Sequence, residues 1–75
     1  MNYNVKTLRS AGLEAKWTKT RRGAPIMVAR DPNSDQQHQR SRWWYVDRMM
    51  WELMQKLGVR EGFDSATLLG DLFSI

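Results

Sequence analysis

The sequence contains no cysteine, and this absence excludes a disulfide framework, a thiolate metal site and a cysteine nucleophile. Its single histidine, His38, lies in a polar stretch without a neighbouring nucleophile, which is typical of a solvated loop residue rather than a general base. The nearest approach to a carboxylate pair, Asp31 and Asp35, is explained by turn formation and solvation. A glycine-rich phosphate loop is also missing. We therefore expect neither an enzyme nor a protein that holds a metal or a cofactor.

Long hydrophobic runs are missing too. No apolar stretch has the length needed to cross a bilayer, and the first residues lack the charged and apolar regions of a signal peptide. Small secreted domains usually depend on disulfides, so the lack of cysteine favours a reducing compartment. We expect a soluble, cytoplasmic protein. Its 75 residues have the length of one small domain, which leaves little stability for a strained active site.

Positive charge, in contrast, is abundant and unevenly placed. The formal net charge is +4. Residues 1–48 carry ten Lys or Arg and four Asp or Glu, whereas residues 49–75 carry two and four. Such a division favours contact between the first two-thirds of the chain and an anionic partner. Ordinary solvation of a small surface is the alternative explanation.

The N-terminal part predicts a β-hairpin. Residues 15–20 and 24–30 are rich in β-branched and aromatic side chains, and Gly23 between them supplies the positive φ that a three-residue hairpin loop needs. Upstream, Val5–Ala11 carries apolar residues at helical spacing and predicts one or two helical turns, although an extended start also fits. Downstream, Asp31–Gln39 contains no apolar residue and predicts a turn followed by a loop.

The C-terminal part predicts two helices. The first spans Arg42–Leu57, with Ser41 as its N-cap and Gly58 as its end. The second spans Phe63–Phe73, with Asp64 as its N-cap. The apolar positions that define the first helix at helical spacing are Trp43, Val46, Met50, Leu53 and Leu57.

These segments together predict an α+β fold. We expect one small domain over residues 1–75, in which a β-hairpin packs against one long helix and short additional helices complete the core. The domain divides into an N-terminal segment with the hairpin (residues 1–30), a polar loop (residues 31–40) and a helical part (residues 41–75).

Basic and aromatic residues gather at the predicted hairpin and at the start of the predicted long helix. Arginine forks suit phosphate and carboxylate partners, and aromatic rings between cations suit nucleic acids and protein surfaces. Two alternatives stay open, namely that the lysines protect an edge strand against aggregation and that the aromatic residues fill a small core. The predicted partner-binding residues are Lys16, Trp17, Lys19, Arg21, Arg22, Trp44, Tyr45 and Arg48.

Two stretches of the chain resemble a known family. The chain is similar to small phage-encoded transcription regulators that bind bacterial RNA polymerase, of the Xanthomonas phage type, in LRSAGLEAKWTKTRRGAPIMVARDP (residues 8–32) and RSRWWYVDRMMWELMQKLG (residues 40–58). The resemblance is one of overall character and length and assigns no individual contact residue. It implies binding to the β and β′ subunits of RNA polymerase, inhibition of transcription initiation by interference with the σ factor, antitermination, and a location in the host cytoplasm.

The residues by themselves leave two binding classes open. A protein-binding modulator would direct the basic hairpin at an anionic patch of a protein complex, whereas a basic nucleic-acid-binding module would direct the same face at phosphates. The acidic C-terminal third and the lack of a recognisable helix-turn-helix or RNA-binding motif favour the first class.

Overall fold

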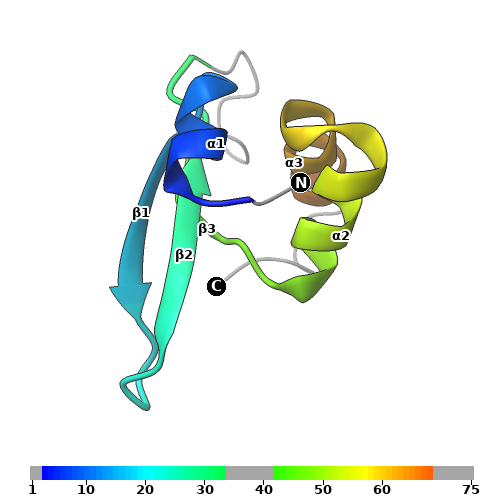
Figure 1. Cartoon of the computed structure of the whole chain (residues 1–75). Coiled ribbons are helices and arrows are strands. Elements are labelled where there is room, and N and C mark those ends of the chain that lie inside the picture. Colours follow the sequence, from blue (N-terminus) through cyan, green and yellow to red (C-terminus); the bar gives the residue numbers. More distant parts are fainter. Residues whose placement is uncertain (1–2, 34–41, 69–75) are drawn as a thin grey trace.

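The computed structural model describes residues 3–33 and 42–68 of the chain. These residues form a three-stranded antiparallel sheet and three helices, so the predicted α+β class is confirmed. Figure 1 shows the sheet on one side and the two C-terminal helices packed together beside it. None of the helices in the described ranges is long and apolar enough to cross a membrane. In chain order the elements are α1 (Val5–Ser10), β1 (Glu14–Lys19), β2 (Pro25–Arg30), β3 (Trp44–Tyr45), α2 (Arg48–Leu57) and α3 (Val59–Leu68).

The hairpin prediction is confirmed. β1 and β2 pair in antiparallel register from Glu14 opposite Arg30 to Lys19 opposite Pro25. At the turn, the Thr20 amide donates to the Ala24 carbonyl at 2.8 Å, and Gly23 has a φ of 83°. That φ lies in the left-handed region, which glycine enters without steric cost.

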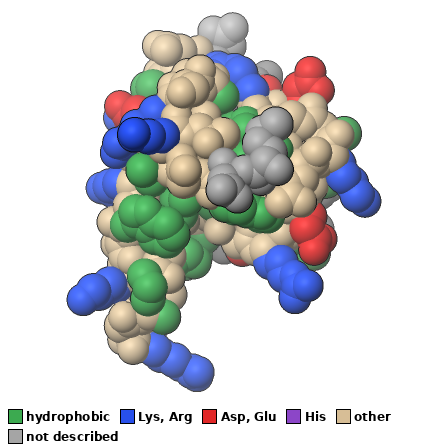
Figure 2. Space-filling model, viewed as in Figure 1, with side chains coloured by type: hydrophobic (Ala, Val, Ile, Leu, Met, Phe, Trp, Pro, Cys, Tyr) green, Lys and Arg blue, Asp and Glu red, His purple; other side chains and the backbone are tan. Residues whose placement is uncertain are grey.

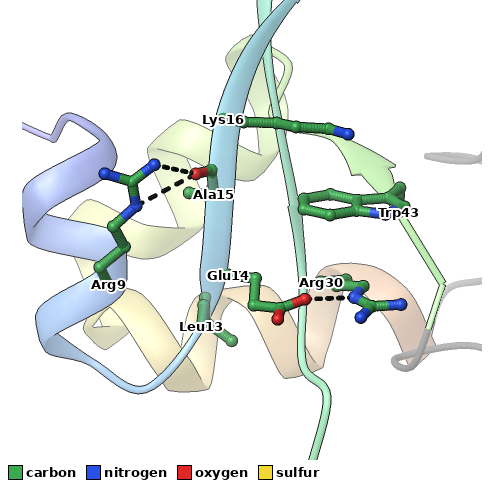
Figure 3. Close-up of a pocket in the computed structure, with 7 residues that line it drawn as sticks. All are labelled: Arg9, Leu13, Glu14, Ala15, Lys16, Arg30 and Trp43. Atoms are coloured by element: carbon green, nitrogen blue, oxygen red, sulfur yellow. Dashed lines mark hydrogen bonds and ion pairs between the residues drawn. The ribbon is translucent and has the colours of Figure 1, made fainter.

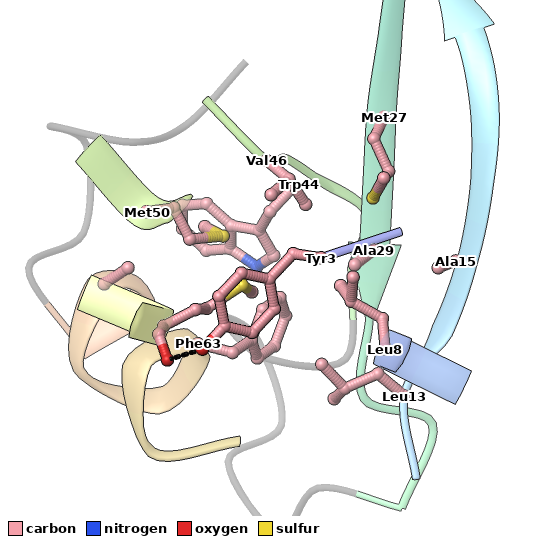
Figure 4. Packing of buried hydrophobic residues seen from close by; sticks show 12 residues of the cluster. Tyr3, Leu8, Leu13, Ala15, Met27, Ala29, Trp44, Val46, Met50 and Phe63 are labelled. Atoms are coloured by element: carbon pink, nitrogen blue, oxygen red, sulfur yellow. Dashed lines mark hydrogen bonds between the residues drawn. The ribbon is translucent and has the colours of Figure 1, made fainter. Parts of the chain in front are cut away.

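The predicted N-terminal helix is also confirmed, as α1. The Asn4 side chain accepts a hydrogen bond from the Thr7 amide at 3.0 Å and caps the first turn. Leu8 is the fully buried residue of this helix and packs beside Leu13 and Ala15 at one end of the core (Figure 4).

The prediction of one long helix from Arg42 to Leu57 is wrong in its first part. Trp44 and Tyr45 form β3, which pairs with β2, and the Val46 amide donates to the Met27 carbonyl at 2.8 Å. The helix starts only at Arg48, where the Asp47 side chain accepts from the Met50 amide at 2.9 Å. Aromatic and β-branched residues fit a strand well, so the open ladder of β2 outweighs the helical periodicity of this segment. Ser41, the predicted N-cap, lies outside the described residues.

The end of α2 is as predicted, but α3 starts earlier than expected. Gly58 has a φ of 100° and closes α2 through a hydrogen bond from its amide to the Met54 carbonyl. α3 follows directly at Val59, so Asp64 lies inside this helix and its prediction as an N-cap is wrong. Residues 69–73 of the predicted second helix lie outside the described residues.

Close packing of α2 and α3 depends on a glycine. A Cβ atom on Gly62 would lie 2.5 Å from the backbone of Met54 and 2.6 Å from the carbonyl carbon of Leu53. Since real Cβ atoms do not approach backbone so closely, the two helices could not keep this separation with any other residue at this position. The two helices predicted for the C-terminal part are thus present as a tightly packed pair of ten residues each, with boundaries that differ from the predicted ones.

The core lies between the sheet and this helix pair (Figure 4). Tyr3 closes it on one side, because its hydroxyl donates to the Met54 carbonyl and its ring meets Trp51 edge to face at 5.1 Å between centroids. The largest fully buried apolar side chains are Trp44, Phe63, Leu8, Met50 and Met54.

An ion pair links the turn that follows β2 to α3. The Asp31 carboxylate, 2% exposed, accepts from Arg60 of α3 at 2.7 Å and from the Asn33 amide at 3.1 Å. Arg60 also donates to the Ala11 carbonyl at 2.9 Å. The predicted turn at residues 31–33 is thus confirmed, and one guanidinium ties it to α3 and to the end of α1.

Candidate docking surface

The distal half of the hairpin extends beyond the core. Ala15 is buried in β1, but the residues that follow it are exposed up to the turn, and Pro25 is exposed at the start of β2. Trp17 is 59% exposed although its strand partner Met27 is buried. The helices cover the sheet only near its other end, so the hairpin projects from the body of the protein (Figure 1).

Unpaired positive charge lies at the projecting end. Lys19, Arg21 and Arg22 are exposed, and within the described ranges no carboxylate lies within ion-pair distance of them. In Figure 2, Lys and Arg side chains stand out from the lower end of the hairpin, with hydrophobic side chains between them. This end of the molecule therefore carries an exposed indole on the same strand face as Lys19, with Arg21 and Arg22 in the adjoining turn. We call Trp17, Lys19, Arg21 and Arg22 the hairpin surface.

A second group of cations and rings lies on the sheet face that α2 and α3 do not cover. The Lys16 ammonium lies 4.5 Å and the Arg30 guanidinium 5.3 Å from the centroid of the Trp43 ring (Figure 3). Strand register explains the arrangement, because Lys16 lies opposite Val28, and Val28 opposite Tyr45, so these side chains share one face.

An open depression of about 590 Å³ lies beside this group. The cations around it already have partners within the chain, since Arg9 donates to the Ala15 carbonyl at 2.8 Å and Arg30 pairs with Glu14 (Figure 3). No set of three or more His, Cys, Asp or Glu side chains in the described ranges converges on a possible metal site. The cations and the Trp43 ring that line this depression are suited to bind charged groups and planar rings. The lining residues are Arg9, Leu13, Glu14, Ala15, Lys16, Arg30 and Trp43.

The structure divides the eight predicted partner-binding residues. Trp44 is only 1% exposed and fills the core, so its prediction as a docking anchor is wrong. Tyr45 is half-buried on the sheet face that carries Lys16. Arg48 lies on α2 and not on the hairpin. Its side chain is 93% exposed and pairs with Glu52 at 3.5 Å. On the hairpin, Trp17 and Lys19 share one face, Lys16 points to the other, and Arg21 and Arg22 lie in the turn.

Two residues of the site were missed from the sequence. Trp43 was expected in the core and Arg30 was not among the predicted contacts, yet both lie on the accessible sheet face. A strand in place of a helix over Trp43, Trp44 and Tyr45 would have placed the first and third on one face and the second on the other. The exchange of Trp43 and Trp44 between surface and core follows from this one difference in secondary structure.

Comparisons with models of protein families, with curated proteins and with solved structures found no match to this chain.

Proposed function

We propose that this chain is a non-enzymatic binding protein that docks its hairpin surface onto an anionic patch of a larger macromolecule. The partner we propose is bacterial RNA polymerase, through its β and β′ subunits. There a phage-encoded regulator of this kind would inhibit initiation by interfering with the σ factor and would act as an antiterminator. The observation that supports a binding role is the exposed Trp17 on the same hairpin as Lys19, Arg21 and Arg22, which have no carboxylate partner among the described residues.

Within the hairpin surface, the cations and the indole have different roles in binding. Exposed cations raise the rate of encounter with an anionic surface and fix the orientation of docking. An exposed indole supplies apolar area that is buried only in the complex, and Trp and Arg are the residue types that dominate binding free energies at interfaces. A projecting hairpin presents both without moving the core, since the distal residues make few contacts with the helices.

The test uses two double variants that change the net charge equally. Arg21→Glu with Arg22→Glu alters the hairpin surface, whereas Lys6→Glu with Lys56→Glu alters exposed positions on α1 and α2. Binding to core RNA polymerase is measured by calorimetry, with folding checked by circular dichroism. We expect the hairpin variant to lose at least about tenfold in affinity, or about 1.4 kcal/mol, and the control to lose much less. Equal losses would contradict the proposal.

Nucleic acid is the rival partner, and binding of the wild-type chain to oligonucleotides distinguishes it. A nucleic-acid-binding module should bind short single-stranded DNA or RNA with a steep dependence on salt, because each phosphate contact releases counterions. Binding of the wild-type chain to oligonucleotides that is stronger than its binding to polymerase would reverse the assignment of the partner.

A further inference from the structure

The outer edge of β1 carries main-chain groups that pair with nothing in the described structure. Three hydrogen bonds fix which residues point outwards. The Thr20 amide donates across the hairpin to Ala24, the Met27 carbonyl accepts from Val46 on the β3 side, and the Ala15 carbonyl accepts from Arg9 outside the sheet. Because the main-chain groups of successive residues in an antiparallel pair alternate in direction, residues 14, 16 and 18 face β2 and residues 15, 17 and 19 face outwards.

Only the first part of this edge is covered. The Arg9 guanidinium caps the Ala15 carbonyl with bonds of 2.8 and 3.2 Å, on the side of β1 away from β2 (Figure 3). Further along, the N–H and C=O groups of Trp17 and Lys19 have no hydrogen-bond partner within residues 3–33 and 42–68, and no described element lies beside this half of β1 (Figure 1). Two consecutive outward residues are enough to form one hydrogen-bonded pair with an added strand and to begin the next.

The opposite edge of the hairpin does not offer such a template. β3 covers Val28 and Ala29 of β2, Val46 occupies the Met27 carbonyl, and Pro25 beyond them has no amide hydrogen to donate. Proline and short covering strands are the usual protections of a sheet edge. In the described part of the chain, β1 has neither over its distal half, where its edge carries positively charged side chains instead.

The geometry therefore points to strand addition at this edge: we infer that the distal half of β1 pairs with an extended, acidic segment of a protein partner. Alternating main-chain donors and acceptors are satisfied by another peptide backbone, whereas phosphates can only accept. A second copy of this chain is disfavoured, since it would place Lys16 and Lys19 beside the same cations of the partner edge. Acidic side chains on the added strand would instead face Lys16 on one side and Lys19 on the other.

The depression beside Trp43 lies at the covered end of the same edge. An added strand that continues past Trp17 reaches the cations Arg9 and Lys16 there. Arg9 and Lys16 keep their charge there although they contact Ala15 and Trp43, and Glu14 in the same lining offsets part of it, while the Arg9 cap on Ala15 would stop the pairing from extending further. The site thus specifies a short acidic segment. This inference rests on the proposed function in that it names how a protein partner is held.

The direct test is amide hydrogen exchange of the ¹⁵N-labelled full chain in the presence of a synthetic peptide of alternating Val and Glu. We expect the Trp17 and Lys19 amides to exchange at least about tenfold more slowly at millimolar peptide, and the Lys16 and Thr18 amides, already bonded within the hairpin, to change little. A peptide of alternating Val and Lys should leave all four unchanged. Absence of slowing at Trp17 and Lys19, or equal slowing with the basic peptide, overturns the inference. Slowing of these amides by a single-stranded oligonucleotide overturns it as well.

A pair of variants separates this inference from the choice of partner. Lys19→Pro removes the outward N–H, and Lys19→Ala removes the same side chain but keeps that N–H. Because Lys19 donates no hydrogen bond within the described fold, both variants should keep the hairpin, which the NMR spectrum checks. We expect Lys19→Pro to bind core RNA polymerase at least about fivefold more weakly than Lys19→Ala. Equal binding overturns strand addition and leaves the proposed function standing. Protection by the acidic peptide without any polymerase binding supports the strand-addition site and overturns the proposed partner.

Discussion

Replacement of Arg60 by methionine tests whether the Arg60–Asp31 pair holds α3 against the turn that follows β2. Arg60 donates to the buried Asp31 carboxylate at 2.7 Å and to the Ala11 carbonyl at 2.9 Å. Methionine keeps most of the side-chain length and the helix propensity but removes both donors. The variant therefore leaves Asp31, 2% exposed, with the Asn33 amide as its one remaining partner among the described residues.

The magnitude follows from the burial of each partner. Removal of one member of a fully buried ion pair costs about 3–5 kcal/mol. The Arg60 side chain is 43% exposed, so water can reach part of the vacated site, and we reduce the expected loss to about 2 kcal/mol. For a domain of this length, each kcal/mol corresponds to a change of about 4–8 °C in the midpoint of thermal unfolding. We expect Arg60→Met to lower the midpoint by about 8–16 °C.

Thermal and urea unfolding followed by circular dichroism provide the measurement. The matched control is Arg48→Met, since Arg48 is 93% exposed and its i,i+4 pair with Glu52 spans 3.5 Å. Exposed pairs of this kind contribute about 0.3–0.5 kcal/mol. Arg60→Met combined with Asp31→Asn should recover part of the loss, because the unpaired charge is gone. If Arg60→Met shifts the midpoint no more than the Arg48→Met control, the pair does not support the fold.

Two further predictions concern packing. Gly62→Ala should destabilise the protein by at least about 1–3 kcal/mol, because the added methyl meets the Met54 backbone at 2.5 Å; a stability within error of wild type in urea unfolding would show that the helices have room to separate. Trp44→Ala should cost about 3–5 kcal/mol, since its ring is buried, whereas Trp43→Ala should cost about 1 kcal/mol through lost contacts with its neighbouring cations. A larger loss of stability for Trp43→Ala than for Trp44→Ala in the same assay would indicate that Trp43 is the buried residue, as the predicted helix Arg42–Leu57 implies.

Local sequence signals were sufficient to predict the structure wherever the conformation of a segment depends mainly on its own residues. The hairpin was predictable because its strand residues and the positive φ of Gly23 act over a few neighbouring positions. The end of α2 was predictable for the same reason, since Gly58 closes it within one turn. The basic hairpin tip could also be identified from the sequence, because a tight turn places its charged residues at the surface wherever the hairpin lies.

Long-range pairing decided what local signals could not. Trp43, Trp44 and Tyr45 are compatible with a helix and with a strand, and only the exposed ladder of β2 selects the strand. That selection exchanges Trp43 and Trp44 between surface and core, which moved one predicted contact residue into the interior. Likewise, Gly62 lies between the two helices predicted from the sequence, and only the packing of α2 against α3 shows why this position requires glycine.

The sequence by itself thus determined the α+β class, the hairpin with its turn, the end of α2 and the concentration of positive charge on the first two-thirds of the chain. Only the tertiary structure decided which indole faces the core and which main-chain groups at the edge of β1 remain open. The physical reason is that propensity and charge are properties of neighbouring residues, whereas burial and hydrogen-bond satisfaction depend on segments that meet only after folding.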